Sequence, residues 1–178
     1  MYKFSYTLND TDYLEFNIFH ANNSAVYKKQ LLVLRLLLPL VLAVLLLVYY
    51  TYNRDPLELL IKGIVYAIGS LLWFFVAKSL RTSSIKSNIK AMKKSGKLPF
   101  GKNTEIQFGE DDIHDISELS ESKIKYSVIE KIAMGKNAIY IYFSSIQAFI
   151  IPFSVFENEE QKADFLAFIN QKFAAYKK

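Results

Sequence analysis

Residues 36–48 read LLLPLVLAVLLLV, an apolar run without one charged side chain. The uncharged stretch continues to Tyr52, and a second one covers residues 63–77. A helix needs about 20 mostly apolar residues to cross a hydrocarbon core of ~30 Å. Both stretches reach that length when charged side chains at their ends extend to the membrane surface. We therefore expect two membrane-spanning helices, at about residues 33–52 and 57–78.

Two other interpretations of these stretches fit the sequence less well. A buried helical hairpin in a soluble core would keep a polar face, and residues 36–48 have none. A cleavable signal peptide would lie near the N-terminus and end in a small-residue cleavage site. This run instead starts about thirty residues in, and a second apolar stretch follows it at once. The membrane hairpin is the favoured interpretation.

A short polar segment separates the two stretches. Tyr49, Tyr50 and Tyr52 suit the membrane–water interface. Residues 53–56 (NRDP) are typical of a tight turn, with the proline at the start of the next helix. Because so short a loop returns the chain to the membrane at once, both termini are expected on the same side.

The net charge of +5 is distributed unevenly along the chain. Residues 1–30 are balanced, residues 31–99 carry ten basic and two acidic side chains, and residues 100–178 carry nine basic and twelve acidic ones. Only Arg54 lies in the outer loop. Because basic residues flank membrane spans on the cytoplasmic side, the pattern predicts a multi-pass protein of the plasma (inner) membrane with both termini in the cytoplasm.

Basic side chains gather where the second span ends. Apolar residues recur at helical spacing among lysines, so residues 81–99 are expected to form a basic amphipathic helix and linker. The anionic inner leaflet attracts about 1 kcal/mol per nearby Lys or Arg; charge that only sets the topology is the alternative. Nucleic acid is not expected as a partner, because no aromatic platform accompanies the lysines. The predicted membrane-surface contacts are Arg35, Lys78, Arg81, Lys86, Lys90, Lys93, Lys94 and Lys97.

The segments on either side of the hairpin differ in kind. Residues 1–30 begin with the alternation of a strand and continue as a helix from about Thr11 toward Lys29. Residues 100–178 contain about six short strands and one closing helix. The expected fold class is a membrane α+β protein: a two-helix transmembrane hairpin (31–80) with long cytoplasmic helical extensions, and a small antiparallel β-domain closed by a C-terminal helix. Pleckstrin-homology-like domains have this arrangement. Whether the N-terminal strand joins the sheet stays open.

The sequence contains few groups that could perform chemistry. It has no cysteine, which excludes disulfides and thiol nucleophiles, and it has no phosphate-binding loop, nucleophile elbow or zinc-binding helix motif. Residues 111–115 (DDIHD) could attract a divalent cation, but a solvated turn and strand is the favoured interpretation. His20 and Asn17 are expected to be polar residues of structural or functional importance on the first helix, with packing favoured over catalysis for His20. We expect no catalytic residue, no metal site and no cofactor.

Stretches near both ends of the chain are similar to one protein family. The N-terminal ones are YTL at 6–8 and DYLEFN at 12–17, followed by His20, Ser24, Arg35 and Pro39. The C-terminal ones are SKIKY at 122–126, Ile129, YIY at 140–142 and AFIIP at 148–152. In this order they resemble the YcxB-like family of bacterial membrane proteins.

The resemblance implies a membrane hairpin with a cytoplasmic pleckstrin-homology-like domain, and no established activity. In that family a basic residue commonly follows the strand-ending proline, whereas Phe153 and Ser154 follow Pro152 here. If relatives bind an anionic ligand at that position, this chain is not expected to bind one there.

The expected function is that of a non-enzymatic, membrane-anchored binding or scaffold module. It would present the β-domain to a protein segment or a lipid headgroup at the inner membrane surface. The alternative is a transporter or channel, or an accessory subunit of one; two spans enclose no pathway, so it would be a homo-oligomer, with polar groups at the span ends in Arg35, Glu58 and Lys62. An enzyme that uses His20 or His114 is a third hypothesis, for which no partner nucleophile is identified.

Overall fold

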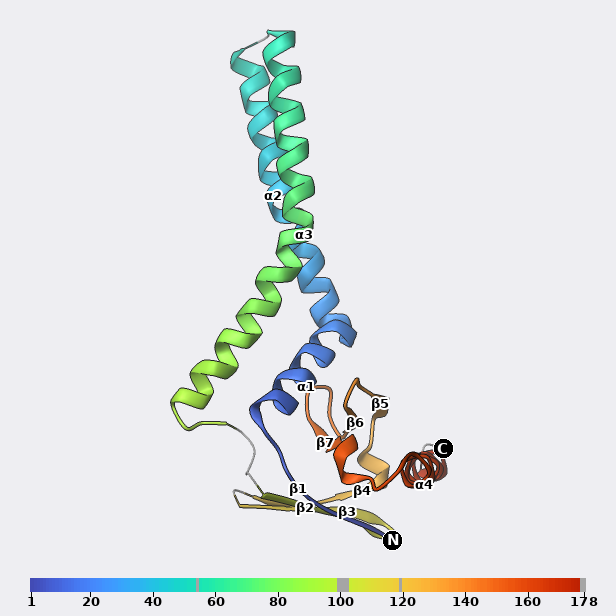
Figure 1. Cartoon of the computed structure of the whole chain (residues 1–178). Coiled ribbons are helices and arrows are strands. Elements are labelled where there is room, and N and C mark those ends of the chain that lie inside the picture. Colours follow the sequence, from blue (N-terminus) through green and yellow to red (C-terminus); the bar gives the residue numbers. More distant parts are fainter. Residues whose placement is uncertain (54, 99–102, 119, 177–178) are drawn as a thin grey trace. The chain divides into compact units, whose positions relative to one another are not determined.

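The computed structural model describes residues 1–53, 55–98, 103–118 and 120–176 (Figure 1). The chain divides into two compact units. We call residues 21–88 the helical hairpin. The other unit, which we call the β-domain, joins residues 1–20 to residues 89–178. The β-domain is therefore built from two segments between which the whole helical hairpin is inserted.

The helical hairpin is formed by two long helices, α2 (Ala25–Tyr52) and α3 (Pro56–Lys94). Both predicted spans lie within these helices. Each helix is long and apolar enough to cross a membrane, and none of its most apolar window is buried inside the protein. Helices that expose apolar side chains in this way are compatible with membrane insertion and differ from the buried core helices of soluble proteins.

Each helix of the hairpin bonds to the backbone of the other at a point far from the turn. Arg35 of α2 donates from Nε to the carbonyl oxygen of Phe74 at 3.1 Å, and its guanidinium lies 4.1 Å from the centre of the Phe74 ring. Trp73 of α3 donates from Nε1 to the carbonyl oxygen of Leu34 at 2.9 Å. These reciprocal bonds hold α2 and α3 as antiparallel neighbours, as Figure 1 shows.

Polar side chains also join the two helices near the turn. The Tyr49 hydroxyl donates to the Glu58 carboxylate and accepts a hydrogen bond from Nδ2 of Asn53 at 2.9 Å. Lys62 Nζ lies 3.3 Å from the centre of the Tyr49 ring. Asp55 caps α3, because its Oδ1 accepts from two backbone N–H groups of the first turn. The helix ends match the predicted turn, of which Arg54 lies outside the described residues.

The last turns of α3 contain the predicted basic helix, which continues the second span without a break. The helix stops just before Gly96, which adopts a φ of 66°. The N–H of Lys97 bonds to the carbonyl of Met92, and that of Gly96 to the carbonyl of Lys93, which is a Schellman motif. Pro99, a residue type common just beyond a helix end, lies outside the described residues.

The β-domain contains two antiparallel sheets among its described residues. The first has four strands in the order β1-β2-β3-β4, and the second has three in the order β5-β6-β7. A C-terminal helix, α4 (Glu159–Tyr176), follows them. The strands are β1 (Tyr2–Thr7), β2 (Asn103–Phe108), β3 (Asp112–Ser117), β4 (Glu121–Lys125), β5 (Lys131–Met134), β6 (Ala138–Tyr142) and β7 (Ala148–Pro152).

The N-terminal strand belongs to the first sheet, which answers the question that the sequence left open. β1 pairs with β2 along its whole length, from Tyr2 opposite Phe108 to Thr7 opposite Asn103. Thr7 and Asn103 are 96 positions apart in the sequence, yet the Thr7 hydroxyl also donates to Asn103 Oδ1 at 3.3 Å. The helical hairpin is thus an insertion in the connection between two neighbouring strands of one sheet.

Aromatic side chains fill the space between the first sheet and α4. Phe4 of β1 is 6% exposed, and its ring centroid lies 5.2 Å from those of Phe156 and Phe165. Phe165 is fully buried and meets Phe108 edge to face at 4.9 Å. The closing helix therefore covers the first sheet with the face that contains Phe165.

The first helix, α1 (Asp10–Asn23), packs against the second sheet through Phe16. Phe16 is buried, and its ring centroid lies 5.2 Å from that of Tyr140. At the start of the helix, Asn9 Oδ1 accepts hydrogen bonds from two backbone N–H groups. The Asp12 carboxylate in turn accepts a hydrogen bond from the backbone N–H of Asn9. This capping box fixes the direction in which the chain leaves β1.

The expectation that α1 runs on toward Lys29 is wrong. The helix ends at Asn23, Ser24 adopts an extended conformation with a ψ of 131°, and α2 begins at Ala25. Asn22, Asn23 and Ser24 are residue types that favour helix ends over helix interiors, which is consistent with a break at this position, although Ser24 makes no side-chain cap hydrogen bond.

Candidate functional site

The inward face of the first sheet changes from apolar to polar along its strands. Ile113 of β3 is fully buried. Two residues further along, Asp115 is opposite Ile106, and then Ser117 is opposite Thr104. Side chains two positions apart share one face of a strand. The Asp115 carboxylate and the hydroxyls of Thr104 and Ser117 therefore lie on the inner face of the sheet. They are in line with Ile113, which belongs to the core.

A pocket of about 460 Å³ lies over this polar end of the sheet. β1 to β4 supply its polar lining, which includes Tyr6, Thr104, Asp115, Ser117, Ser120 and Ser122. α1 and the β6–β7 hairpin supply apolar walls, which include Phe16, Phe143, Ile146 and Phe149. A pocket of this volume fits a small ligand or one long side chain of a partner.

Asp115 is the one ionised side chain at neutral pH among the residues that line the pocket. It is partly buried, and burial raises its pKa above the ordinary value for aspartate, which neighbouring His114 partly offsets. Within the described part of the chain, no group donates a hydrogen bond to this carboxylate. The Tyr6 hydroxyl, in the same lining, instead donates to the carbonyl oxygen of Ile150 at 2.8 Å and so links the two sheets.

Asp115→Asn is expected to stabilise the β-domain at pH 7. A raised pKa means that the folded state favours the protonated carboxyl, so the ionised form opposes folding above that pKa. The penalty fades as the pH falls through the folded pKa and is gone below the unfolded value of about 4. Because water still reaches the group, we expect a gain below ~1 kcal/mol at pH 7 and none at acid pH. Urea unfolding of both proteins at pH 7 and below pH 4 measures this difference, and a less stable variant at pH 7 would contradict it.

The acid-rich stretch at residues 111–115 is dispersed over two faces of its strand. Asp115 faces the pocket and shares its face of the strand with Ile113, while Asp112 and His114 lie on the other face because successive strand residues alternate. Among the described residues, no group of three or more His, Asp or Glu side chains is placed to hold a metal ion. The other polar groups have separate partners: Asp111, just before β3, meets Tyr176 at 3.0 Å, Asp112 meets Lys123 at 3.2 Å, and His114 meets Glu121 at 2.8 Å.

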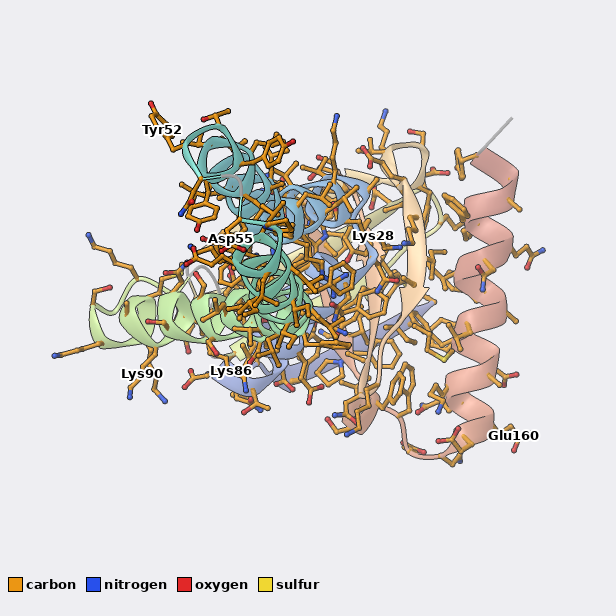
Figure 2. The ribbon with its side chains drawn as sticks, turned by 90° about the horizontal axis from the view of Figure 1, so that it is seen from above. Lys28, Tyr52, Asp55, Lys86, Lys90 and Glu160 are labelled. Carbon is orange, nitrogen blue, oxygen red and sulfur yellow. The ribbon has the colours of Figure 1, made fainter. Side chains whose placement is uncertain are left out.

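Six of the predicted membrane-surface residues are lysines with exposed side chains. Figure 2 shows Lys86 and Lys90 extending outward from α3. Ile89, in the same turns of α3, is 7% exposed, so these turns combine exposed lysines with one buried apolar side chain. The structure thus leaves a row of ammonium groups accessible to solvent or to a surface. The six are Lys78, Lys86, Lys90, Lys93, Lys94 and Lys97.

The two predicted arginines make contacts inside the helical hairpin. Arg35 bonds to the backbone of α3, as described above. Arg81 donates to the Gln30 side chain at 2.6 Å, and its guanidinium lies 4.7 Å from the centre of the Tyr27 ring. Both arginines are partly buried, so they connect α2 and α3 in addition to any contact with a membrane.

Asn17 and His20 lie on α1 in positions that suit packing. Asn17 donates from Nδ2 to the carbonyl oxygen of Tyr13, one turn earlier, at 2.7 Å. The His20 ring centroid lies 6.1 Å from that of Phe16 and 5.9 Å from that of Tyr142. Burial first, and then the charge of Lys131, lower the pKa of His20. A neutral imidazole beside two aromatic rings is consistent with the predicted packing role.

The comparison with known proteins concerns the second segment of the β-domain. Residues 108–169 match the family model described as YcxB-like protein. This stretch of the chain is a YcxB-like region. The YcxB-like region contains β3 to β7 and much of α4, and therefore Asp115 and most of the pocket lining. The C-terminal part of the predicted resemblance is confirmed, while β1 and the helical hairpin lie outside the match. No curated protein and no solved structure matches the chain.

Proposed function

We propose that this YcxB-like protein is a non-enzymatic binding or scaffold module anchored in the plasma (inner) membrane. The observation that carries the proposal is the insertion of the helical hairpin between β1 and β2. A domain tethered through one terminus can swing on a single linker. This domain is connected to its anchor on both sides, so it is kept at the membrane surface by two chain segments.

The orientation follows from the same connection. Because β1 and β2 pair in one sheet, both ends of the hairpin leave the membrane on the β-domain's side. The exposed lysines on α3 lie close to the end of the second span, so the positive-inside rule assigns that side to the cytoplasm. Each lysine that comes within ~8 Å of the anionic inner leaflet adds about 1 kcal/mol of attraction.

The fold of the module is proposed to be pleckstrin-homology-like. A four-stranded and a three-stranded antiparallel sheet, followed by a helix that covers an aromatic core, support this assignment. In this protein the first strand-to-strand connection would hold the membrane anchor. The ligand would be a protein segment or a lipid headgroup, and the pocket beside Asp115 is the candidate site.

The alternative, an oligomeric transporter or channel subunit, has less support from the hairpin. Its polar candidates Arg35, Glu58 and Lys62 are bonded to groups within the same hairpin. A group that is satisfied in this way gives up those bonds when it lines a pathway, which costs free energy in an apolar medium.

Site-specific photocrosslinking in native membranes tests the proposal. A photoreactive residue replaces Ile146, which is 66% exposed at the pocket rim; Val128, 49% exposed on the β-domain outside the pocket, is the matched control position. We expect one defined protein or lipid adduct from position 146 and none from position 128. Equal, unspecific labelling from both positions, or no adduct from either, would count against a binding module. Adducts only between copies, through a photoreactive residue at Ile64 in α3, would favour the oligomeric alternative.

A further inference from the structure

The pocket has a charge composition that restricts its ligand. Its polar side chains are one carboxylate, several hydroxyls and the Gln147 amide, and no lysine, arginine or histidine occurs among the described residues that line it. A buried charge needs an opposite charge or hydrogen-bond donors. A phosphate or carboxylate ligand would find no cation here and would meet Asp115 as a like charge, so the lining disfavours anionic groups.

Asp115 in turn requires a hydrogen-bond donor that the described residues do not supply. No described group donates to its carboxylate, although hydroxyl-bearing Ser122 is directly opposite on β4. The carboxylate is only partly buried, so solvent water can reach it through the pocket. An apolar or anionic occupant would displace that water without replacing its hydrogen bonds, which makes such occupants unfavourable.

The aromatic side chains that line the pocket determine which apolar part the ligand can carry. Aromatic side chains from α1 and the β6–β7 hairpin, including Tyr13, Phe16 and Phe149, stand across from the polar row. Flat aromatic faces accept an apolar stem and attract a cation placed over the ring. The three N–H groups of an ammonium can bond to the carboxylate and to neighbouring hydroxyl oxygens at the same time.

We propose that this pocket binds an ammonium group carried on an apolar stem, with the Asp115 carboxylate as its counterion. Two sources share this chemistry: a free amine, and the lysine side chain of a partner protein. The inference rests on the proposed function, because it names the ligand class of the same site. An anionic lipid headgroup is excluded from the pocket by the proposal and would be confined to the lysines of α3.

The test uses the full chain in detergent micelles, with methyl-labelled isoleucine observed by NMR. Ile146 and Ile150 line the pocket. Ile169 of α4 is fully buried and does not line the pocket, so it reports on the fold. Benzylamine, benzyl alcohol and benzoate share one stem and differ in the head group. Benzylamine should shift the signals of Ile146 and Ile150 and leave Ile169 unchanged, and benzoate should bind at least about tenfold more weakly than benzylamine.

Asp115→Asn keeps the shape of the side chain and removes its charge. It should weaken benzylamine binding about tenfold and change benzyl alcohol binding less than about twofold, because a charged hydrogen bond becomes a neutral one. Asp112→Asn is the matched control: Asp112 lies on the same strand but pairs with Lys123 outside the pocket, and its loss should leave both affinities unchanged. Benzoate binding as tightly as benzylamine to the unmodified protein, or undiminished benzylamine binding to Asp115→Asn, would overturn the proposal.

A peptide arm separates the two sources. An acetylated peptide amide with one lysine between leucines is compared with the same peptide carrying acetyl-lysine, which lacks the charge. Selective binding of the lysine peptide identifies a partner's side chain, and binding of benzylamine alone identifies a free amine. If no ammonium probe binds, this inference is wrong. The proposed function is tested separately, because it depends on the crosslinking result at position 146.

Discussion

Phe4→Ala should lower the free energy of unfolding of the β-domain by ~3–5 kcal/mol, the usual range for removing a buried phenylalanine side chain. Phe4 is 6% exposed, and its ring packs against Phe108, Phe156 and Phe165 at centroid distances of 6.2, 5.2 and 5.2 Å. The helical hairpin separates Phe4 from all three partners in sequence. Since domains of this size are stable by only about 5–15 kcal/mol, the loss is large.

Urea unfolding of the full chain, followed by proteolysis of the unfolded fraction, measures this change. Ser5→Ala is the matched control, because Ser5 is the next residue of the same strand and its side chain is exposed on the outer face. We expect a change within about 0.5 kcal/mol for the control. A loss of less than about 1 kcal/mol for Phe4→Ala would mean that β1 is dispensable, and the insertion of the hairpin into the domain would then be wrong.

Local patterns in the sequence were sufficient to predict most elements. Residues 36–48 are helical and exposed as an apolar run of that length predicts, and the alternation around Tyr140 marks a strand. The pairing of β1 with β2 was not predictable, because the partners Thr7 and Asn103 are 96 positions apart and alternation identifies a strand but not its neighbour. The end of α1 at Asn23 was missed because the apolar periodicity continues past it, although Asn22, Asn23 and Ser24 are residue types that disfavour helix interiors.

The pocket escaped sequence analysis for a related reason. Asp115 stands in an acid-rich stretch that resembles a solvated turn, and only the strand register shows that it shares a face with buried Ile113. The sequence does contain a signal for the inward direction of Asp115: it stands two positions after Ile113. The alternation that buries Ile113 also turns Asp115 inward. Other polar lining residues include Thr104 on β2 and Ser122 on β4. Their position beside Asp115 depends on the order of the strands in the sheet.

A reporter that is active only outside the cytoplasm should stay inactive when fused at Met1 or Lys178 and become active when inserted between Asn53 and Asp55. The first two positions flank the two segments that fold together into the β-domain, so they must lie on one side of the membrane. The lysines beyond the second span assign that side to the cytoplasm. The difference between the fusions is expected to be all or none, since moving the folded β-domain across the bilayer would desolvate its charged surface.

Charge substitutions test the orientation of the helical hairpin in the membrane independently of the pairing between β1 and β2. Glutamine at Lys86, Lys90 and Lys94 removes three charges next to the second span and should give a mixture of orientations, in which the two terminal fusions change together. Glutamine at Lys123, Lys131 and Lys136 removes the same charge from β-domain residues more than forty positions from the predicted end of the second span and should change nothing, because the inside rule acts within about 15–20 residues of a span. Activity at Lys178 of the unmodified chain together with activity at Met1 would reverse the orientation and keep the β1–β2 pairing. Activity at only one terminus would be incompatible with that pairing, because a sheet cannot form across a membrane from strands on opposite sides.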